Sequence, residues 1–202
     1  MDRTIKINTN DTKFNLVAQS ASPAVLLARR GAVVVSATLF VAACAHLSIP
    51  LWFTPVPLTL QPFAVLVLGL LMTPGMAAAT MVAYLAEGAL GMPVFTPHGL
   101  GGLAQLIGPT GGYLVSYPLV APLVSALWRG SSRTFAKATG IAFAGSLVTL
   151  AMGAAWLGYL THLTPSLLVD HAVLPFLPGD AIKVVAAAAI ATSTARIRQH
   201  RI

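Results

Sequence analysis

The chain has 202 residues, of which 56% are hydrophobic and 8% are charged, and its formal net charge is +7 at pH 7. A soluble domain carries about 25% charged residues, so this composition excludes a soluble protein and indicates an integral membrane protein. The positive charge does not indicate a nucleic-acid partner, because the cations fall in three clusters without interleaved aromatic residues. Between Arg30 and Arg129, Glu87 is the only residue with a formal charge.

Six apolar segments are expected to form membrane helices. They cover approximately residues 32–49, 60–71, 76–90, 113–128, 138–160 and 179–194. Three prolines within residues 50–57 exclude a regular helix between the first two segments, and the dipeptide Pro74–Gly75 predicts a tight turn before the third. Glycines in the fifth segment predict close helix packing, at Gly140, Gly145, Gly153 and Gly158.

The basic residues predict the orientation of these helices. They cluster in the N-terminal tail up to Arg30, between Arg129 and Lys137, and from Arg196 to Arg201. Six crossings place all three clusters on one side, and Lys183 is the only cation outside them. Because cytoplasmic loops are enriched in Lys and Arg, both termini are expected in the cytoplasm. We therefore predict cytoplasmic tails over residues 1–28 and 197–202, and a six-helix membrane domain over residues 29–196.

The segment between the third and fourth helices is unusual for a loop. Residues 91–112 read GMPVFTPHGLGGLAQLIGPTGG, which is rich in glycine and proline and contains no Lys or Arg. Irregular backbone at membrane depth is tolerated only when it is buried in protein or lines a cavity. We expect a structured outer loop folded over the membrane-embedded part, with glycines that let backbone N–H groups approach a ligand.

Asp180 and Lys183 are the two ionisable residues at the start of the last segment. They are three residues apart, so on a helix they are neighbours on one face. Charged side chains in a membrane segment are costly and usually pair inside a protein cavity, which favours a binding site. In the alternative interpretation, Asp180 caps the helix N-terminus and Lys183 extends to the membrane surface.

Other polar residues add to this candidate site. Gln61 begins the second segment, and Tyr84 and Glu87 are three residues apart on the third. An apolar cavity with a few convergent polar groups is typical of a small-molecule site. A neutral urea-like group would suit the charged pair, because Asp180 can accept N–H bonds and Lys183 can donate to a carbonyl. The chain has no Walker A motif, so we do not expect it to hydrolyse ATP in the P-loop manner. It has no HExxH motif or cysteine cluster that would indicate a metal, and we expect no cofactor.

Several motifs resemble those of one transporter family. They are PVPLTLQ at 55–61, GMPVF at 91–95, GPTGGY at 108–113 and PGDAIK at 178–183, with Tyr84, Gly88, Gly101 and Gly102 between them. At these residues the chain resembles the BioY family, the biotin-binding S components of energy-coupling factor (ECF) transporters. The motifs cover most of residues 50–185 in the family's order.

The resemblance implies an all-α, six-helix protein of the bacterial inner (cytoplasmic) membrane with a high-affinity, outward-facing biotin site. It implies that a transmembrane T component and cytoplasmic ATPase subunits energise biotin uptake, and that biotin is a transported ligand. Asp180 and Lys183 would hold the ureido ring, with help from Tyr84 and Glu87. Backbone near Gly101 and Gly102 would meet the valerate tail. Gln61 and Tyr113 are the remaining ligand-binding candidates, since both lie in the matching motifs.

Two other functions are compatible with the same residues. A self-sufficient secondary carrier would need an ion-coupling site, for which Glu87 is the candidate outside the Asp180–Lys183 pair. An intramembrane enzyme would need an acid pair at one depth, such as Glu87 with Asp180. The transporter subunit remains the leading hypothesis, with the lipid bilayer, biotin and the coupling proteins as its partners.

Overall fold

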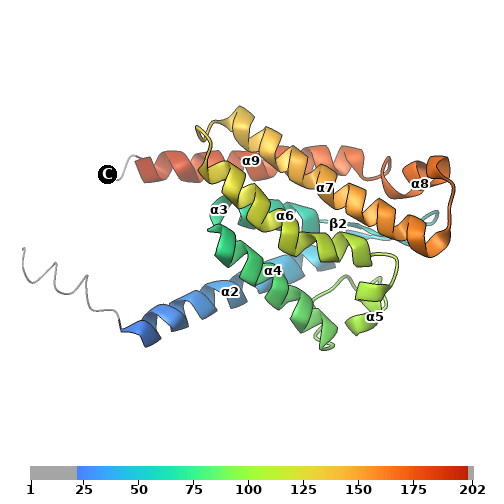
Figure 1. The fold of residues 1–202 in the computed structure, drawn as a ribbon, viewed down its shortest axis with the longest axis horizontal. Coiled ribbons are helices and arrows are strands. Elements are labelled where there is room, and N and C mark those ends of the chain that lie inside the picture. The colour runs from blue at the N-terminus through green and yellow to red at the C-terminus, as the bar shows by residue number, and fades with distance from the viewer. Residues whose placement is uncertain (1–21, 200–202) are drawn as a thin grey trace, which may run out of the picture.

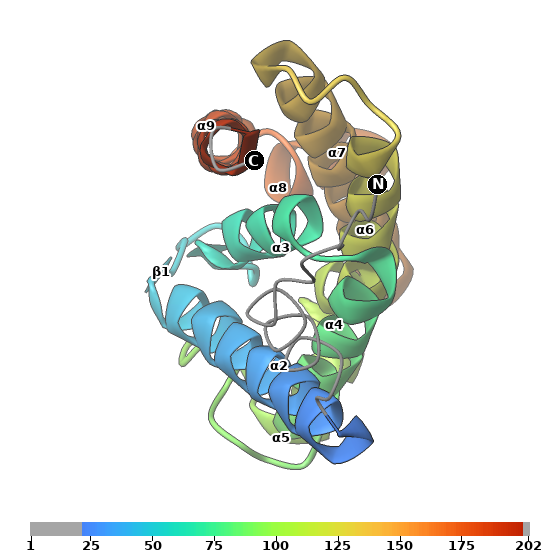
Figure 2. The same ribbon diagram turned by 90° about the vertical axis from the view of Figure 1, so that its left-hand side faces the viewer.

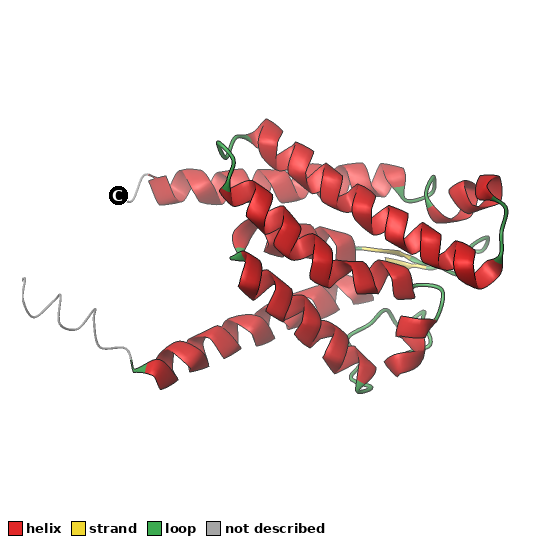
Figure 3. Cartoon of the chain, viewed as in Figure 1, coloured by secondary structure: helices red, strands yellow, loops and turns green. Residues whose placement is uncertain are grey.

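The computed structural model describes residues 22–199 and is mostly helical (Figures 1 and 3). Its helices are α2 (Pro23–His46), α3 (Gln61–Leu71), α4 (Pro74–Ala89), α5 (Gly102–Ile107), α6 (Gly111–Arg129), α7 (Phe135–Thr161), α8 (Pro165–Ala172) and α9 (Leu177–Gln199). Strands β1 (Ser48–Ile49) and β2 (Leu58–Thr59) pair antiparallel, with Ser48 opposite Thr59. Each of the six predicted segments therefore contains a helix, and the proline-rich stretch between the first two forms a short hairpin.

Helices α2, α6 and α7 are each long and apolar enough to cross a membrane. Helices α8 and α9 are bent by 50° at a short break and together could form a fourth span. Helix α3 is apolar but has only 11 residues. At 1.5 Å per residue it is roughly 17 Å long, against a hydrocarbon core of about 30 Å. By length and composition, the described residues contain three or four membrane spans.

Three helices begin at a Ser–Pro or Thr–Pro pair. The Ser22 hydroxyl accepts a hydrogen bond from the Val25 N–H, and the Thr73 hydroxyl accepts one from the Met76 N–H, both at 3.4 Å. Proline is tolerated at the first helical position because its missing N–H has no partner there. Pro74 already begins α4, so the turn predicted at Pro74–Gly75 lies just before this dipeptide, between the end of α3 and the start of α4. Thr164 and Pro165 start α8 with the same residue pair, but the Thr164 hydroxyl makes no capping hydrogen bond to the backbone of α8.

Helix α6 lies at the centre of the bundle, in contact with α3, α4 and α7. Helix α9 packs on α3 and α7, and α2 packs on α3 and α4. The start of α2, the end of α9 and the α3–α4 and α6–α7 connections lie at one end of the molecule, on the left in Figure 1 and facing the viewer in Figure 2. The hairpin, α5 and α8 lie at the opposite end.

Glycines of α7 set its close contact with neighbouring elements. A Cβ atom on Gly153 would overlap the ring of Tyr113 from α6, so a larger residue would displace that tyrosine. Close packing at α7 glycines is confirmed at Gly145, Gly153 and Gly158. The prediction of close packing is wrong at Gly140, where a Cβ atom would have open space around it.

The predicted tails lie largely outside the described residues. Of the proposed N-terminal tail, residues 1–21 lie outside them, and α2 already begins at Pro23. At the other end α9 extends to Gln199, and residues 200–202 lie outside the described range.

Candidate ligand-binding pocket

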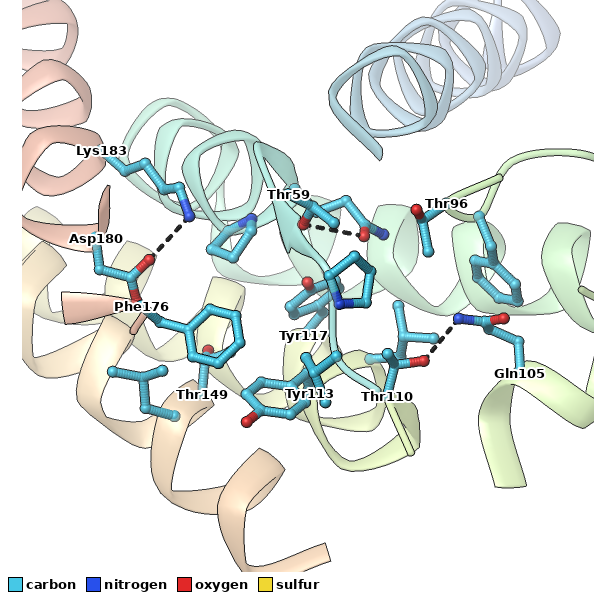
Figure 4. A pocket seen from close by; sticks show the side chains of 17 residues that line it. Thr59, Thr96, Gln105, Thr110, Tyr113, Tyr117, Thr149, Phe176, Asp180 and Lys183 are labelled. Atoms are coloured by element: carbon cyan, nitrogen blue, oxygen red, sulfur yellow. Dashed lines mark hydrogen bonds and ion pairs between the residues drawn. The ribbon is translucent and has the colours of Figure 1, made fainter. Parts of the chain in front are cut away.

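A pocket lies between α3, α6, α7 and α9, beneath the hairpin and the segment that precedes α6 (Figure 4). Its walls are mainly apolar and aromatic, formed by residues such as Val56, Phe95, Leu114, Leu150 and Phe176. Polar side chains are fewer and occupy separate parts of the lining. Mostly apolar walls with a few placed polar groups are the usual composition of a small-molecule site.

A buried ion pair occupies one end of the pocket. The Lys183 ammonium donates a hydrogen bond to Oδ1 of Asp180 at 2.9 Å. The hydroxyl of Ser146, from α7, donates to the other oxygen, Oδ2, at 2.8 Å. Asp180 and Lys183 are each only 7% exposed. This geometry contradicts the interpretation in which Lys183 extends to the membrane surface, and it favours a site on one helix face.

The ion pair retains hydrogen-bonding capacity towards the pocket. An ammonium has three N–H donors, and Lys183 uses one of them on Asp180. A carboxylate has about four acceptor positions, and the described contacts to Asp180 use one on each oxygen. A ligand that presents both N–H donors and a carbonyl acceptor can therefore bond to both side chains without breaking their contact.

Gln61 lines the pocket and is held from behind by Tyr84. The Gln61 amide donates to the Tyr84 hydroxyl at 2.6 Å, and that hydroxyl donates to the carbonyl of Val94 at 2.8 Å. Tyr84 is completely buried and is not among the lining residues. It therefore fixes both Gln61 and the segment that carries Phe95, whose ring lies edge-on to the Tyr84 ring.

The other predicted residues divide between the lining and its surroundings. Tyr113 lines the pocket, and its hydroxyl donates to the Ala172 carbonyl of α8 at 2.8 Å. Glu87 lies outside the lining, half-buried, and accepts a hydrogen bond from the Thr38 hydroxyl at 3.0 Å. Of the eight predicted site residues, the lining contains Gln61, Tyr113, Asp180 and Lys183, and does not contain Tyr84, Glu87, Gly101 or Gly102.

Gly101 and Gly102 shape the loop that supplies another lining residue. Their φ angles are +69° and +56°, in the left-handed region that glycine adopts without strain. The Gly101 N–H donates to Oε1 of Gln105 at 3.1 Å. Gln105 is only 2% exposed and lines the pocket. Gly101 thus contacts the lining residue Gln105, and neither glycine is itself part of the lining.

Sequence reasoning missed several polar residues of the lining, among them Thr59, Thr96, Gln105, Thr110, Tyr117 and Thr149, together with Ser146 behind Asp180. Ser146 and Thr149 are three residues apart and buried in the apolar middle of α7. Such a polar pair on one face of a membrane helix is the signal that could have identified α7 as part of the site. Within residues 22–199, no three His, Cys, Asp or Glu side chains gather in a way that could hold a metal ion.

Comparison with known proteins identifies one family. The sequence model of the BioY family matches residues 12–200. The probable biotin transporter BioY of Pyrococcus horikoshii is 36% identical over 137 residues, which cover 68% of this chain and 79% of that protein. The biotin transporter BioY of Thermotoga maritima is 33% identical over 164 residues, covering 81% of this chain and 94% of that protein.

A solved structure has the same fold. It is the crystal structure of the S-component for biotin from an ECF-type ABC transporter. The two folds superpose with a TM-score of 0.75 at 27% sequence identity, over 86% of this chain and 93% of the other.

Proposed function

The chain belongs to the BioY family, and we propose that it is the biotin-binding membrane subunit of an ECF transporter. The observation that carries the proposal is the Asp180–Lys183 pair, buried at one end of a mainly apolar pocket. The chain is not an enzyme, as its membership of a transporter family establishes. The intramembrane acid pair has no support either, because Glu87 lies outside the pocket and contacts Thr38.

We propose that the ion pair binds the ureido ring of biotin. That ring presents two N–H donors and one carbonyl acceptor. The free acceptor positions of Asp180 would receive the N–H groups, and a remaining N–H of Lys183 would donate to the carbonyl. Removing two charges from water costs free energy, which further hydrogen bonds offset. The apolar walls would surround the sulfur-containing ring and the aliphatic tail.

Titration calorimetry of the purified full-length chain in lipid nanodiscs tests this function. Biotin is expected to bind with one-to-one stoichiometry. Lipoate is a matched control, because it has a sulfur-containing ring and a pentanoate tail but no ureido group. We expect lipoate not to compete with biotin. Equal binding of both would show that the ion pair does not recognise the ureido ring, and absence of biotin binding would contradict the function itself.

Replacement of Ser146 by alanine is expected to weaken biotin binding about fivefold. The change removes the donor to Oδ2 of Asp180, and the net contribution of one such hydrogen bond is roughly 1 kcal/mol. Ser125→Ala is the matched control, because the Ser125 hydroxyl is also buried but donates to the Met72 carbonyl, away from the pocket. Unchanged affinity of Ser146→Ala, or an equal loss in the control, would argue against the role of Ser146.

We propose that the chain crosses the membrane six times, with the outer loop between α4 and α6 and both termini in the cytoplasm of a bacterial cell. A helix at each of the six predicted positions supports this topology. The segments that carry the basic clusters near Arg30, Arg129 and Arg196 gather at one end of the bundle, as the positive-inside rule requires (Figure 2).

Cysteine labelling tests this topology in a Cys44→Ala background. Asp170 on α8 and Arg133 in the α6–α7 connection are both exposed. In intact cells, a membrane-impermeant maleimide is expected to label Asp170→Cys but not Arg133→Cys, and permeabilisation should expose both. The opposite labelling pattern would show that the orientation is the reverse of the one proposed. Labelling of both cysteine variants in intact cells would contradict the six crossings.

We further propose that a transmembrane T component and cytoplasmic ATPase subunits energise uptake. The fold of an S-component from an ECF-type ABC transporter supports this assembly. The alternative, a self-sufficient carrier, would use Glu87 for ion coupling. Uptake of labelled biotin by cells that express the chain with and without an ECF module separates the two. Accumulation is expected only with the module, and equal accumulation without it would favour the carrier.

A further inference from the structure

The end of the pocket that faces away from the ion pair has a neutral lining. Gln105, Thr110 and Thr96 lie there, while Asp180 and Lys183 lie at the opposite side (Figure 4). Among the described residues that line the pocket, Lys183 is the only Lys or Arg, and it is bonded to Asp180. A ligand whose ureido ring binds the ion pair would therefore direct its tail towards amide and hydroxyl groups, and not towards a cation.

Gln105 and Thr110 also separate this pocket from a second one. The second pocket shares these two residues and is otherwise lined by Pro55, His98, Gly99, Leu100, Gly108 and Pro109. The two side chains meet through one hydrogen bond, from Nε2 of Gln105 to the Thr110 hydroxyl, at 2.6 Å. The second pocket has a volume of about 310 Å³, which is within the range of small-molecule pockets.

This lining does not distinguish a carboxylate from an amide. Gln105 has both donor and acceptor atoms, and each threonine hydroxyl can donate or accept. A carboxylate forms an ion pair only with a cationic partner, and the described residues at this end of the pocket supply none. A neutral amide can satisfy the same groups, and its substituent can continue past Gln105 into the second pocket.

We propose that the pocket selects the ureido ring and not the free carboxylate, and so accepts N-substituted biotin amides, whose substituent lies in the second pocket beside His98 and Leu100. This inference rests on the function proposed above. It identifies the ligand class as biotin together with its carboxyl-linked amides, of which N-biotinyl-lysine is a representative.

Calorimetric titration of the purified full-length chain with biotin, biotinamide and N-biotinyl-lysine tests the inference. The three dissociation constants are expected to agree within tenfold. If biotin binds and biotinamide binds more than tenfold more weakly, the carboxylate is recognised and the inference is overturned while the function stands. If biotin itself does not bind, the proposed function fails first.

A variant tests where the substituent lies. Leu100 is 70% exposed at the second pocket and is not part of the first. Leu100→Trp should narrow the second pocket, weakening N-biotinyl-lysine at least fivefold and leaving biotin unchanged. Leu90→Trp is the control, because Leu90 is 85% exposed and lines neither pocket. Unchanged affinity of Leu100→Trp for N-biotinyl-lysine, or an equal loss for both ligands, would overturn this placement.

Discussion

Substitution of Asp180 by asparagine is expected to weaken biotin binding by roughly 30-fold or more. Asparagine keeps the shape of the side chain but removes its charge and replaces one acceptor oxygen by an N–H₂ donor. Lys183 would then be a buried cation without its carboxylate, and a ureido N–H would face a donor. Losing one partner of a buried, hydrogen-bonded charge pair costs about 2–5 kcal/mol, and every 1.4 kcal/mol changes affinity about tenfold.

Asp170→Asn provides the matched control for this experiment. Asp170 is an exposed carboxylate on α8, and it lies outside the pocket lining. Calorimetry on both purified variants in nanodiscs measures the change in biotin affinity. Size-exclusion profiles confirm that each variant is folded. If Asp180→Asn loses less than threefold in biotin affinity, or if Asp170→Asn shows a similar loss, the ion pair is not part of the binding site.

Substitution of Lys183 by methionine should have an effect of similar size. Methionine retains an unbranched, flexible side chain but has no ammonium group. Among the described residues, the Ser146 hydroxyl would be the remaining side-chain donor to Asp180, and the ligand carbonyl would lose the Lys183 ammonium as its donor. We expect biotin affinity to fall roughly 30-fold or more, since a buried carboxylate is left without its cation.

The double variant separates the ion pair from its two members. In Asp180→Asn/Lys183→Met neither charge remains unpaired, so the combined loss of binding free energy is expected to be smaller than the sum of the single losses. Lys137→Met, at the exposed start of α7, controls for the removal of a lysine elsewhere. Strict additivity of the two pocket substitutions would show that the side chains act on the ligand independently.

Much of the fold could be predicted from the sequence, because a membrane imposes strong rules on composition. An apolar stretch in a nearly chargeless chain identifies a helix without reference to its neighbours, and each of the six predicted positions contains one. Helices α5 and α8 escaped prediction for the opposite reason. With 6 and 8 residues they are too short to give a hydropathy signal, and only the Thr164–Pro165 pair marks a helix start.

The candidate site was predictable only where its residues share a helix. The spacing of Asp180 and Lys183 places them on one face, and the 2.9 Å contact between them agrees with that expectation. Ser146 binds the same carboxylate from another helix, 34 residues away. Sequence periodicity indicates which residues share a face, but it does not reveal how two helices are rotated relative to each other.

Tyr84 and Glu87 show the limit of the spacing argument. Residues three apart on a helix differ by roughly 60° in direction, which is enough for each to contact a different neighbour. Tyr84 bonds to Gln61 beside the pocket, while Glu87 receives its hydrogen bond from Thr38 on α2. The three-residue spacing therefore predicts that the two side chains lie on the same side of the helix, but it does not predict that they contact the same neighbour.

The partition formed by Gln105 and Thr110 has a kinetic consequence. Two hydrogen bonds hold the Gln105 side chain in place, one to the Thr110 hydroxyl and one from the Gly101 N–H, and each such bond contributes about 0.5–1.5 kcal/mol net. At a combined free energy of about 1–3 kcal/mol, conformers with both bonds broken make up roughly 0.6–16% of the population at room temperature. Rotation of an amide side chain is fast compared with helix movement. Opening between the two pockets requires no helix movement, so we expect dissociation rates to report mainly on the contacts at the charged end.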